Sequence, residues 1–174
     1  MGLNRLGEIR ALVTDVDGVM TNGAITVGAQ GETKTFNVRD GFAIKLLQKT
    51  GHEFALLSGR ASAPVEARAK ELGIAVVKVG RIDKQRALGE IVAELGIPAN
   101  QIAYIGDDLP DLAPLQMAAV SFCPCDAAAE VRAIVDHIVP LEGGRGVVRY
   151  VVETILKAQG LWRSCVSRFE VEGG

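Results

Sequence analysis

The stretch RALVTDVDGVMTNG, residues 10–23, decides the fold, because a short apolar run in it ends at two aspartates, Asp15 and Asp17. Such a run, bounded by turn residues, is typical of a strand that is buried on both faces of a parallel sheet. Polar groups that follow such a strand lie at the carboxyl edge of the sheet, where open α/β sheets bind their ligands. The two carboxylates are therefore either a solvated strand end or part of a chemical site.

The rest of the chain alternates strand patterns with helix patterns, as a parallel sheet requires. Further strands are predicted at 53–59, 75–80, 101–108 and 119–124. Helices are predicted over 40–51, 63–73, 83–96 and 146–160, with a short helix between the last two strands. In the first helix, Phe42, Leu46 and Leu47 share one face. The pattern predicts a doubly wound, Rossmann-like parallel α/β domain over 1–160, with a β-hairpin insertion at about 24–37, no cap domain and a mobile tail over 161–174.

Composition narrows the class of protein. A chain of 174 residues suits one domain, and a net charge of −2 gives no general attraction to nucleic acid. No apolar run is long enough to span a bilayer, and the first residues lack a signal-peptide pattern, so we expect a cytoplasmic protein without a membrane partner. The CPC sequence at 123–125 and Cys165 lack the spacing and further ligands of a zinc site, which favours reduced thiols.

Three other predicted strands also end in polar groups. The second ends at Ser58, Gly59 and Arg60, the third is followed by Lys84, and the fourth ends at Asp107. Because all these strand ends meet at one edge, Asp15 and Asp107 would repel each other unless a cation lay between them. Oxygen ligands without His or Cys favour Mg²⁺, which commonly pairs with phosphate.

The same groups can transfer a phosphoryl group. Ser58, Lys84 and the amides near Gly18 and Gly59 supply donors to phosphate oxygens. A carboxylate beside them can attack phosphorus, and a carboxyl two residues later can protonate the leaving oxygen and then activate water. The spacing favours a magnesium-dependent phosphatase site.

The motifs DVDGVMT, LSGR, Lys84 and GDDLPD, in this order, resemble those of the haloacid dehalogenase superfamily of phosphohydrolases. The resemblance implies Asp15 as nucleophile and metal ligand, and Asp17 as general acid/base and metal ligand through its carbonyl. Ser58 and Lys84 would hold the phosphoryl group, and Asp107 would complete the metal site. Asp108 and Asp111 would orient Lys84 or metal-bound water.

A narrower resemblance links FNVRDGFAIKLLQ, AYIGDDLPDL, GGRGVVR and AQG to the 3-deoxy-D-manno-octulosonate (KDO) 8-phosphate phosphatases. These are capless homotetramers in which neighbouring subunits complete each active site, and the resemblance implies the same here. It implies substrate contacts at Asp17, Gly18, Asn37, Val38, Arg39, Asp40, Gly41, Lys45, Gly59, Arg60, Arg68 and Lys84. The loop FCPCDA, residues 122–127, departs from the family's AVADA-like run.

Three alternatives remain open at this point. Close relatives of this family act on nonulosonate 9-phosphates, and a catalytically silent member could scaffold a sugar acid cytidylyltransferase. A receiver-type signalling domain shares the fold size, Mg²⁺ and a phosphorylated aspartate. A receiver, however, has its acceptor Asp on a different strand, and neither a receiver nor a scaffold has a use for Asp17.

Overall fold

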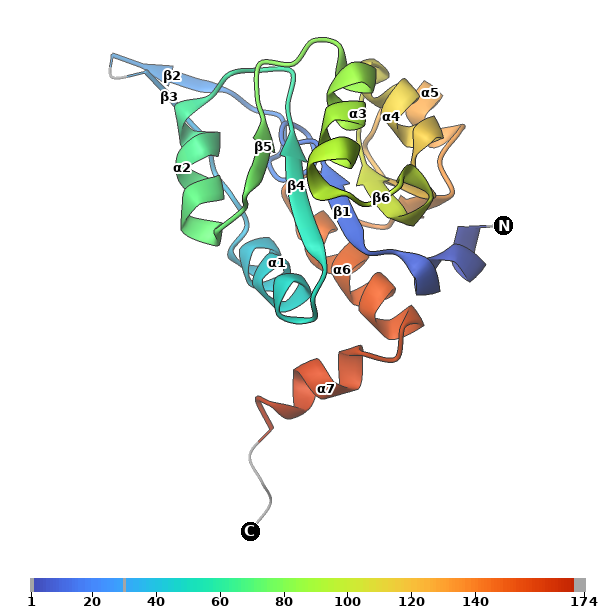
Figure 1. Cartoon of the computed structure of the whole chain (residues 1–174). Coiled ribbons are helices and arrows are strands. Elements are labelled where there is room, and N and C mark those ends of the chain that lie inside the picture. Colours follow the sequence, from blue (N-terminus) through green and yellow to red (C-terminus); the bar gives the residue numbers. More distant parts are fainter. Residues whose placement is uncertain (1, 30, 171–174) are drawn as a thin grey trace.

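The computed structural model describes residues 2–29 and 31–170, and a parallel sheet of six strands lies at its centre (Figure 1). The strand order is β5–β4–β1–β6–β7–β8. The strands are β1 (Ala11–Thr14), β4 (Glu53–Leu57), β5 (Val76–Lys78), β6 (Ile102–Ile105), β7 (Val120–Pro124) and β8 (His137–Val139). Because β1 pairs with both β4 and β6, its carboxyl end lies in the middle of the sheet edge. The predicted doubly wound α/β fold is confirmed.

Helices cover both faces of the sheet. They are η1 (Gly2–Glu8), α1 (Val38–Lys49), α2 (Ala63–Leu72), α3 (Lys84–Leu95), η2 (Ala99–Gln101), η3 (Leu109–Asp111), α4 (Leu112–Met117), α5 (Ala129–Arg132), α6 (Val147–Ala158) and α7 (Trp162–Ser167). Leu12 of β1 packs into a core with α1, α2 and α6, whereas its neighbour Val13 packs with α3, α4 and α5. Successive strand residues point to opposite faces, so every residue of β1 is buried.

The segment that joins β1 to α1 in the sequence forms a two-stranded hairpin, β2 (Thr26–Gly28) and β3 (Gly31–Thr33), which extends from the body (Figure 1). Val27 lies opposite Glu32 in its antiparallel register. Within the described ranges, the segment between β4 and β5 holds α2 alone, and neither insertion forms a cap. Among the described helices, none combines the length and apolarity that a membrane crossing would need.

The C-terminal segment, predicted from the sequence as a mobile tail after Gly160, contains a short helix in the structure. Trp162 begins the short helix α7, and its ring lies beneath the guanidinium of Arg149, 5.0 Å from ring centre to Cζ. Phe42 is 44% exposed and meets the ring of Phe169 edge-on at 5.5 Å, instead of lying in the core with Leu46 and Leu47. Residues 171–174 of the predicted tail lie outside the described residues.

Candidate active site

A cavity of about 470 Å³ opens at the carboxyl edge of the sheet. Its lining includes the groups that the sequence places at four strand ends: Asp15, Asp17, Gly18, Ser58, Gly59, Arg60, Lys84, Asp107, Asp108 and Asp111. Lys84 opens α3 and Asp111 ends η3, while the other residues belong to the loops that follow β1, β4 and β6. The parallel sheet therefore brings together residues that are far apart in the sequence.

The turn after β1 separates the two aspartates that the sequence places two residues apart. The amide of Asp15 still donates to the Ile105 carbonyl at 2.9 Å, which continues the ladder with β6. The carbonyl of Val16 then accepts from three successive amides, beginning at residue 19, so the chain coils at once. Gly18 has φ of +82°, and a Cβ there would lie 1.9 Å from Oδ2 of Asp107. Glycine is thus required for Asp107 to approach this turn.

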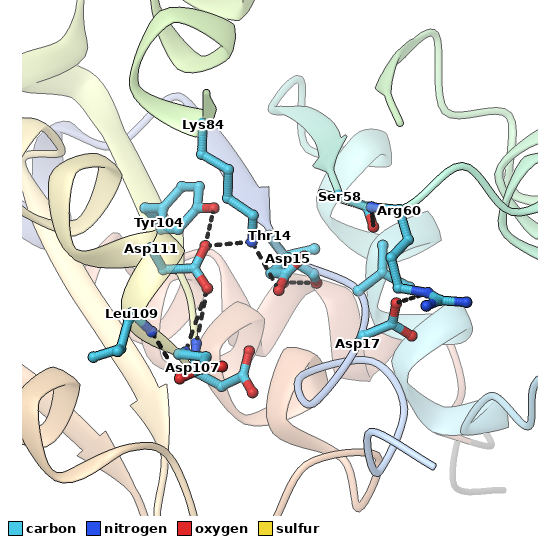
Figure 2. Close-up of polar contacts among 12 residues, drawn as sticks. Thr14, Asp15, Asp17, Ser58, Arg60, Lys84, Tyr104, Asp107, Leu109 and Asp111 are labelled. Atoms are coloured by element: carbon cyan, nitrogen blue, oxygen red, sulfur yellow. Dashed lines mark hydrogen bonds and ion pairs between the residues drawn. The ribbon is translucent and has the colours of Figure 1, made fainter. Parts of the chain in front are cut away.

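Lys84 lies between two buried carboxylates (Figure 2). Its Nζ is 2.9 Å from Oδ2 of Asp15 and 2.8 Å from Oδ1 of Asp111, and its side chain is only 4% exposed. Burial opposes the charge on Lys84, but the attraction of Asp15 and Asp111 outweighs it and raises its pKa. Lys84 therefore stays a cation at the base of the cavity.

Asp111 is fully hydrogen-bonded. Besides Lys84, its Oδ1 accepts from the hydroxyl of Tyr104 at 2.6 Å, and its Oδ2 accepts from the amides of Asp107 and Asp108 at 3.3 and 3.4 Å (Figure 2). Burial raises the pKa of Tyr104 well above its ordinary value, so the ring keeps its proton as a donor. Sequence reasoning missed Tyr104, because an aromatic residue inside an apolar strand has the pattern of a core residue.

The carboxylates of Asp15 and Asp107 are the two candidates for a metal site. Together with Asp111 they place oxygens within 4.8 Å of one another. Oδ1 of Asp15 and Oδ1 of Asp107 are buried and accept no hydrogen bond from the described residues. Burial, with repulsion from Asp111, raises the pKa of Asp15 to about 7. Burial, with repulsion from Asp15, raises the pKa of Asp107 to about 8. A hard divalent cation fits this all-oxygen site and would offset the repulsion.

Asp17 lies on the other side of the cavity from this cluster. Its Oδ1 accepts from Nζ of Lys34, which directly follows β3. Its Oδ2 lies 3.9 Å from Nε of Arg60 (Figure 2). Arg60 donates in turn to Glu32 of the hairpin at 3.0 Å. Sequence reasoning missed Lys34 and Glu32, because the length of a hairpin does not reveal which side chains it turns toward a cavity.

The loop after β4 lines the wall near Lys84 and Arg60. Ser58 is buried, and its Oγ accepts from the amide of Arg60 at 3.2 Å. At Gly59 an added Cβ would first meet Cε of Lys84, at 3.9 Å. This arrangement leaves a hydroxyl and backbone amides beside the lysine, as a phosphate-binding wall requires.

The loop before α6 packs against the turn that carries Asp17 and Gly18. A Cβ on Gly143 would lie 2.1 Å from the carbonyl oxygen of Gly18, and the amide of Gly144 donates to Val19 at 2.9 Å. Asp126, in the loop that departs from the family pattern, accepts from the Gly143 amide at 3.0 Å. The preceding Cys123 is buried in β7, where burial raises the pKa of its thiol to about 11, so the thiol stays protonated.

Seven residues predicted to contact substrate do not line this cavity. They are Asn37, Val38, Arg39, Asp40, Gly41, Lys45 and Arg68. Val38 and Arg68 instead border a second hollow of about 430 Å³, between the α1 and α2 ends. The Asn37 side chain accepts from the amide of Arg39 at 2.9 Å and thereby caps α1. These seven residues therefore lie outside the lining of their own chain's cavity in the described structure, and their contact with substrate stays a prediction.

Asp40 is a buried residue of α1 that binds the start of α6. It is 1% exposed, and its Oδ1 accepts from the amide of Arg149 at 2.7 Å, at the start of α6. Burial raises the pKa of Asp40 to about 6. Its carboxylate therefore ties α6 to α1, which leaves its exposed neighbours Val38 and Arg39 as the surface groups of this turn.

Comparison with known proteins places this geometry in a family. Residues 77–151 match the haloacid dehalogenase-like hydrolases. The 3-deoxy-D-manno-octulosonate 8-phosphate phosphatase of Haemophilus influenzae is 40% identical over 157 residues, which cover 90% of this chain and 87% of that protein. The enzyme of the same name from Yersinia pestis is 40% identical over 158 residues, covering 90% of this chain and 84% of its own length.

A solved structure shows the same agreement. The 3-deoxy-D-manno-octulosonate 8-phosphate phosphatase of Moraxella catarrhalis, in complex with magnesium, phosphate and KDO, superposes with a TM-score of 0.94 at 39% identity. The match covers 97% of this chain and 98% of that one. With relatives this similar over nearly their whole length, the chain belongs to the 3-deoxy-D-manno-octulosonate 8-phosphate phosphatase family of haloacid dehalogenase-like hydrolases.

Proposed function

We propose that this phosphoric monoester hydrolase cleaves 3-deoxy-D-manno-octulosonate 8-phosphate to KDO and phosphate, with Asp15 as the nucleophile. The observation that carries the proposal is the buried Lys84 ammonium between Asp15 and Asp111, beside two carboxylate oxygens without donors in the described structure. Relatives named for this reaction, and a magnesium, phosphate and KDO complex of one of them, support it.

The metal site we propose consists of Asp15, Asp107 and the backbone carbonyl of Asp17. A bound Mg²⁺ would neutralise charge on the phosphoryl oxygens and hold them for attack. Asp108 and Asp111 lie beside these ligands, and Asp111 holds Lys84 in place through the contact described above. Ser58, Gly59 and Lys84 then supply donors to the remaining phosphoryl oxygens.

In the first step, a carboxylate oxygen of Asp15 attacks phosphorus, and the bond between phosphorus and the sugar oxygen breaks. The leaving alkoxide takes a proton from the Asp17 carboxyl, which frees the sugar acid and leaves an acyl phosphate on Asp15. In the second step, Asp17 removes a proton from water, the water oxygen attacks phosphorus, and the bond to Asp15 breaks. Phosphate leaves, and Asp15 returns as a carboxylate.

The carboxylate of the sugar acid would be bound by cationic side chains, and few of these line the cavity at a distance from the phosphoryl site. Arg60 lines it and is half exposed, which suits a carboxylate or a sugar hydroxyl. The rim, in contrast, is apolar: Ile82 is 90% exposed and Ile25 is 42% exposed. We infer that a neighbouring subunit of a homotetramer covers this rim and contributes the cations of the α1 turn and α2, namely Arg39, Lys45 and Arg68.

Phosphate release tests the proposal directly. We expect release from 3-deoxy-D-manno-octulosonate 8-phosphate with Mg²⁺ and its loss in EDTA, with lower kcat/KM on nonulosonate 9-phosphates. A preference for the nine-carbon substrates would reassign the sugar, and an inactive protein with intact Mg²⁺ binding would favour a scaffold.

Dilution tests whether neighbouring subunits complete the substrate pocket. Dilution to monomers should weaken use of the sugar acid phosphate more than use of p-nitrophenyl phosphate. Equal weakening would count against a pocket built by neighbours.

A further inference from the structure

Lys34 is the one lysine of the hairpin region, and its ammonium contacts Asp17, which lines the active-site cavity. It follows β3, and its side chain is 0% exposed. Among the described residues, its ammonium has one carboxylate partner, Oδ1 of Asp17. A buried ammonium is strongly destabilising unless it is paired, so the contact with Asp17 is a requirement of this packing.

The hairpin holds Lys34 firmly in this position. Glu32, two residues earlier, accepts from the hydroxyl of Ser62 and from Arg60 at 3.0 Å, which fastens β3 to the loop after β4. Those two hydrogen bonds lower the pKa of Glu32, with the Ser62 contact as the larger cause. The carboxylate of Glu32 is thereby kept charged as an anchor, and Lys34 approaches Asp17 from a fixed backbone.

The two oxygens of Asp17 are not equivalent. Lys34 occupies Oδ1, whereas Oδ2 is buried and receives no hydrogen bond from the described residues. Asp17 lines the cavity, so Oδ2 is the oxygen left to exchange a proton with the leaving group or with water. Anchoring one oxygen fixes the direction of the other, which shortens the search for a productive geometry.

We propose that Lys34 is a positioning residue for Asp17: it anchors Oδ1 so that Oδ2 faces the leaving oxygen of the substrate. This inference rests on the proposed function, since it deepens the role of the general acid. Under this proposal, the hairpin acts on the active site of its own subunit through Lys34.

A substrate pair with different leaving groups separates this role from phosphate binding. The alkoxide of a sugar acid phosphate needs protonation as it leaves, whereas p-nitrophenolate leaves without help. The parameter kcat/KM reports steps up to release of the leaving group, so it excludes the later attack by water. We expect Lys34→Met to lower kcat/KM by about tenfold or more on the sugar acid phosphate and by less than about threefold on p-nitrophenyl phosphate.

A double-mutant cycle tests whether Lys34 acts through Asp17. In an Asp17→Asn background, Lys34→Met should change kcat/KM on the sugar acid phosphate by less than about twofold. Lys34→Arg should recover part of the lost ratio, and Lys34→Gln should give an intermediate ratio. Lys49→Met, on the exposed end of α1, is the matched control and should match the wild type. Melting temperatures report whether each variant is folded.

Equal losses on both substrates would overturn the proposal, and so would an undiminished loss in the Asp17→Asn background. Should Lys34→Met unfold, a wild-type ratio in Lys34→Gln would overturn it equally. Failure of the proposed function has a different signature, because the wild-type protein itself would then release no phosphate from either substrate.

Discussion

The ammonium of Lys84 lies 2.8 Å from Oδ1 of Asp111, a carboxylate with no exposed surface whose other donors are Tyr104 and two backbone amides. Asp111 does not line up for attack itself, because both its oxygens are occupied. It fixes the direction of Lys84 instead, so that the remaining protons of the ammonium point toward Asp15 and the cavity.

Replacement of Asp111 should therefore lower activity, although we expect Asp111 to act through Lys84 and not through contact with substrate. We expect Asp111→Asn to lower kcat by about 10- to 100-fold, as loss of an orienting partner typically does. Tyr104→Phe is the matched control: it removes one hydrogen bond to the same oxygen and should cost about 1 kcal/mol of unfolding free energy, with kcat within a few fold of the wild type. Steady-state kinetics and chemical denaturation measure both. A Tyr104→Phe loss as large as that of Asp111→Asn would show that Lys84 is not held by charge.

Asp15→Asn should abolish turnover, because an amide cannot attack phosphorus. The fold should persist, since the substitution removes a carboxylate whose pKa is already raised to about 7 by burial and by Asp111. Phosphate release and circular dichroism give the two readouts. Wild-type turnover in Asp15→Asn would exclude an acyl phosphate on this residue.

Magnesium should stabilise the folded protein through Asp107. Binding to the native state alone raises the melting temperature in proportion to the logarithm of metal concentration. We expect this rise in the wild type and its loss in Asp107→Asn, measured by thermal denaturation with and without Mg²⁺. Asp136→Asn is a suitable control for a general salt effect, because Asp136 binds Ser121 beside β7, outside the cavity lining. An unchanged rise in Asp107→Asn would remove Asp107 from the metal site.

The raised pKa of Asp40, which lies outside the cavity lining, leads us to expect that the free energy of unfolding depends on pH. Burial raises its pKa from 3.8 to about 6, so between these values the folded state binds more protons than the unfolded state. Stability from this group is then present at low pH and falls as pH rises through this window, by an amount of the order of 3 kcal/mol. Denaturation across pH 4–7 should show a shallower fall in Asp40→Asn, whose Oδ1 can still cap α6. Identical slopes would show that Asp40 ionises normally.

The close approach of Gly143 to the turn after β1 gives a steric prediction. Gly143→Ala places a methyl group 2.1 Å from the carbonyl oxygen of Gly18, a backbone atom that cannot move away without displacing the turn. We expect a loss of about 1–3 kcal/mol in unfolding free energy and a lower kcat, as overpacking displaces the turn. Gly89→Ala in α3 is the control, since its Cβ would meet nothing within 4 Å and should stabilise the helix slightly. Equal behaviour of the two variants would contradict the close approach.

The sequence predicts the fold and the shared edge because a parallel sheet leaves little freedom in where its strand ends lie. Asp15, Lys84 and Asp107 meet for that reason. The positions of side chains outside the sheet are not set by its strand ends, so the contact of Lys34 with Asp17 is not predictable from the sequence. The strand β8 is only three residues long, which is too short to give a clear sequence pattern. The contact between Phe42 and Phe169 joins residues more than a hundred positions apart. Such contacts depend on tertiary packing, which periodicity within one helix does not encode.

The contact between Gly143 and the turn at Gly18 also affects the order in which the protein becomes competent during synthesis. Asp15 and the turn that follows it emerge from the ribosome early, but the loop that packs against this turn is made after the six described strands of the sheet. An unfinished chain can form local helices and pair its first strands, but it lacks the loop with Gly143 that packs against the turn at Gly18. Ribosome-bound fragments that end before the GGRG loop should therefore be without hydrolytic activity, and activity should first be found in fragments that include this loop.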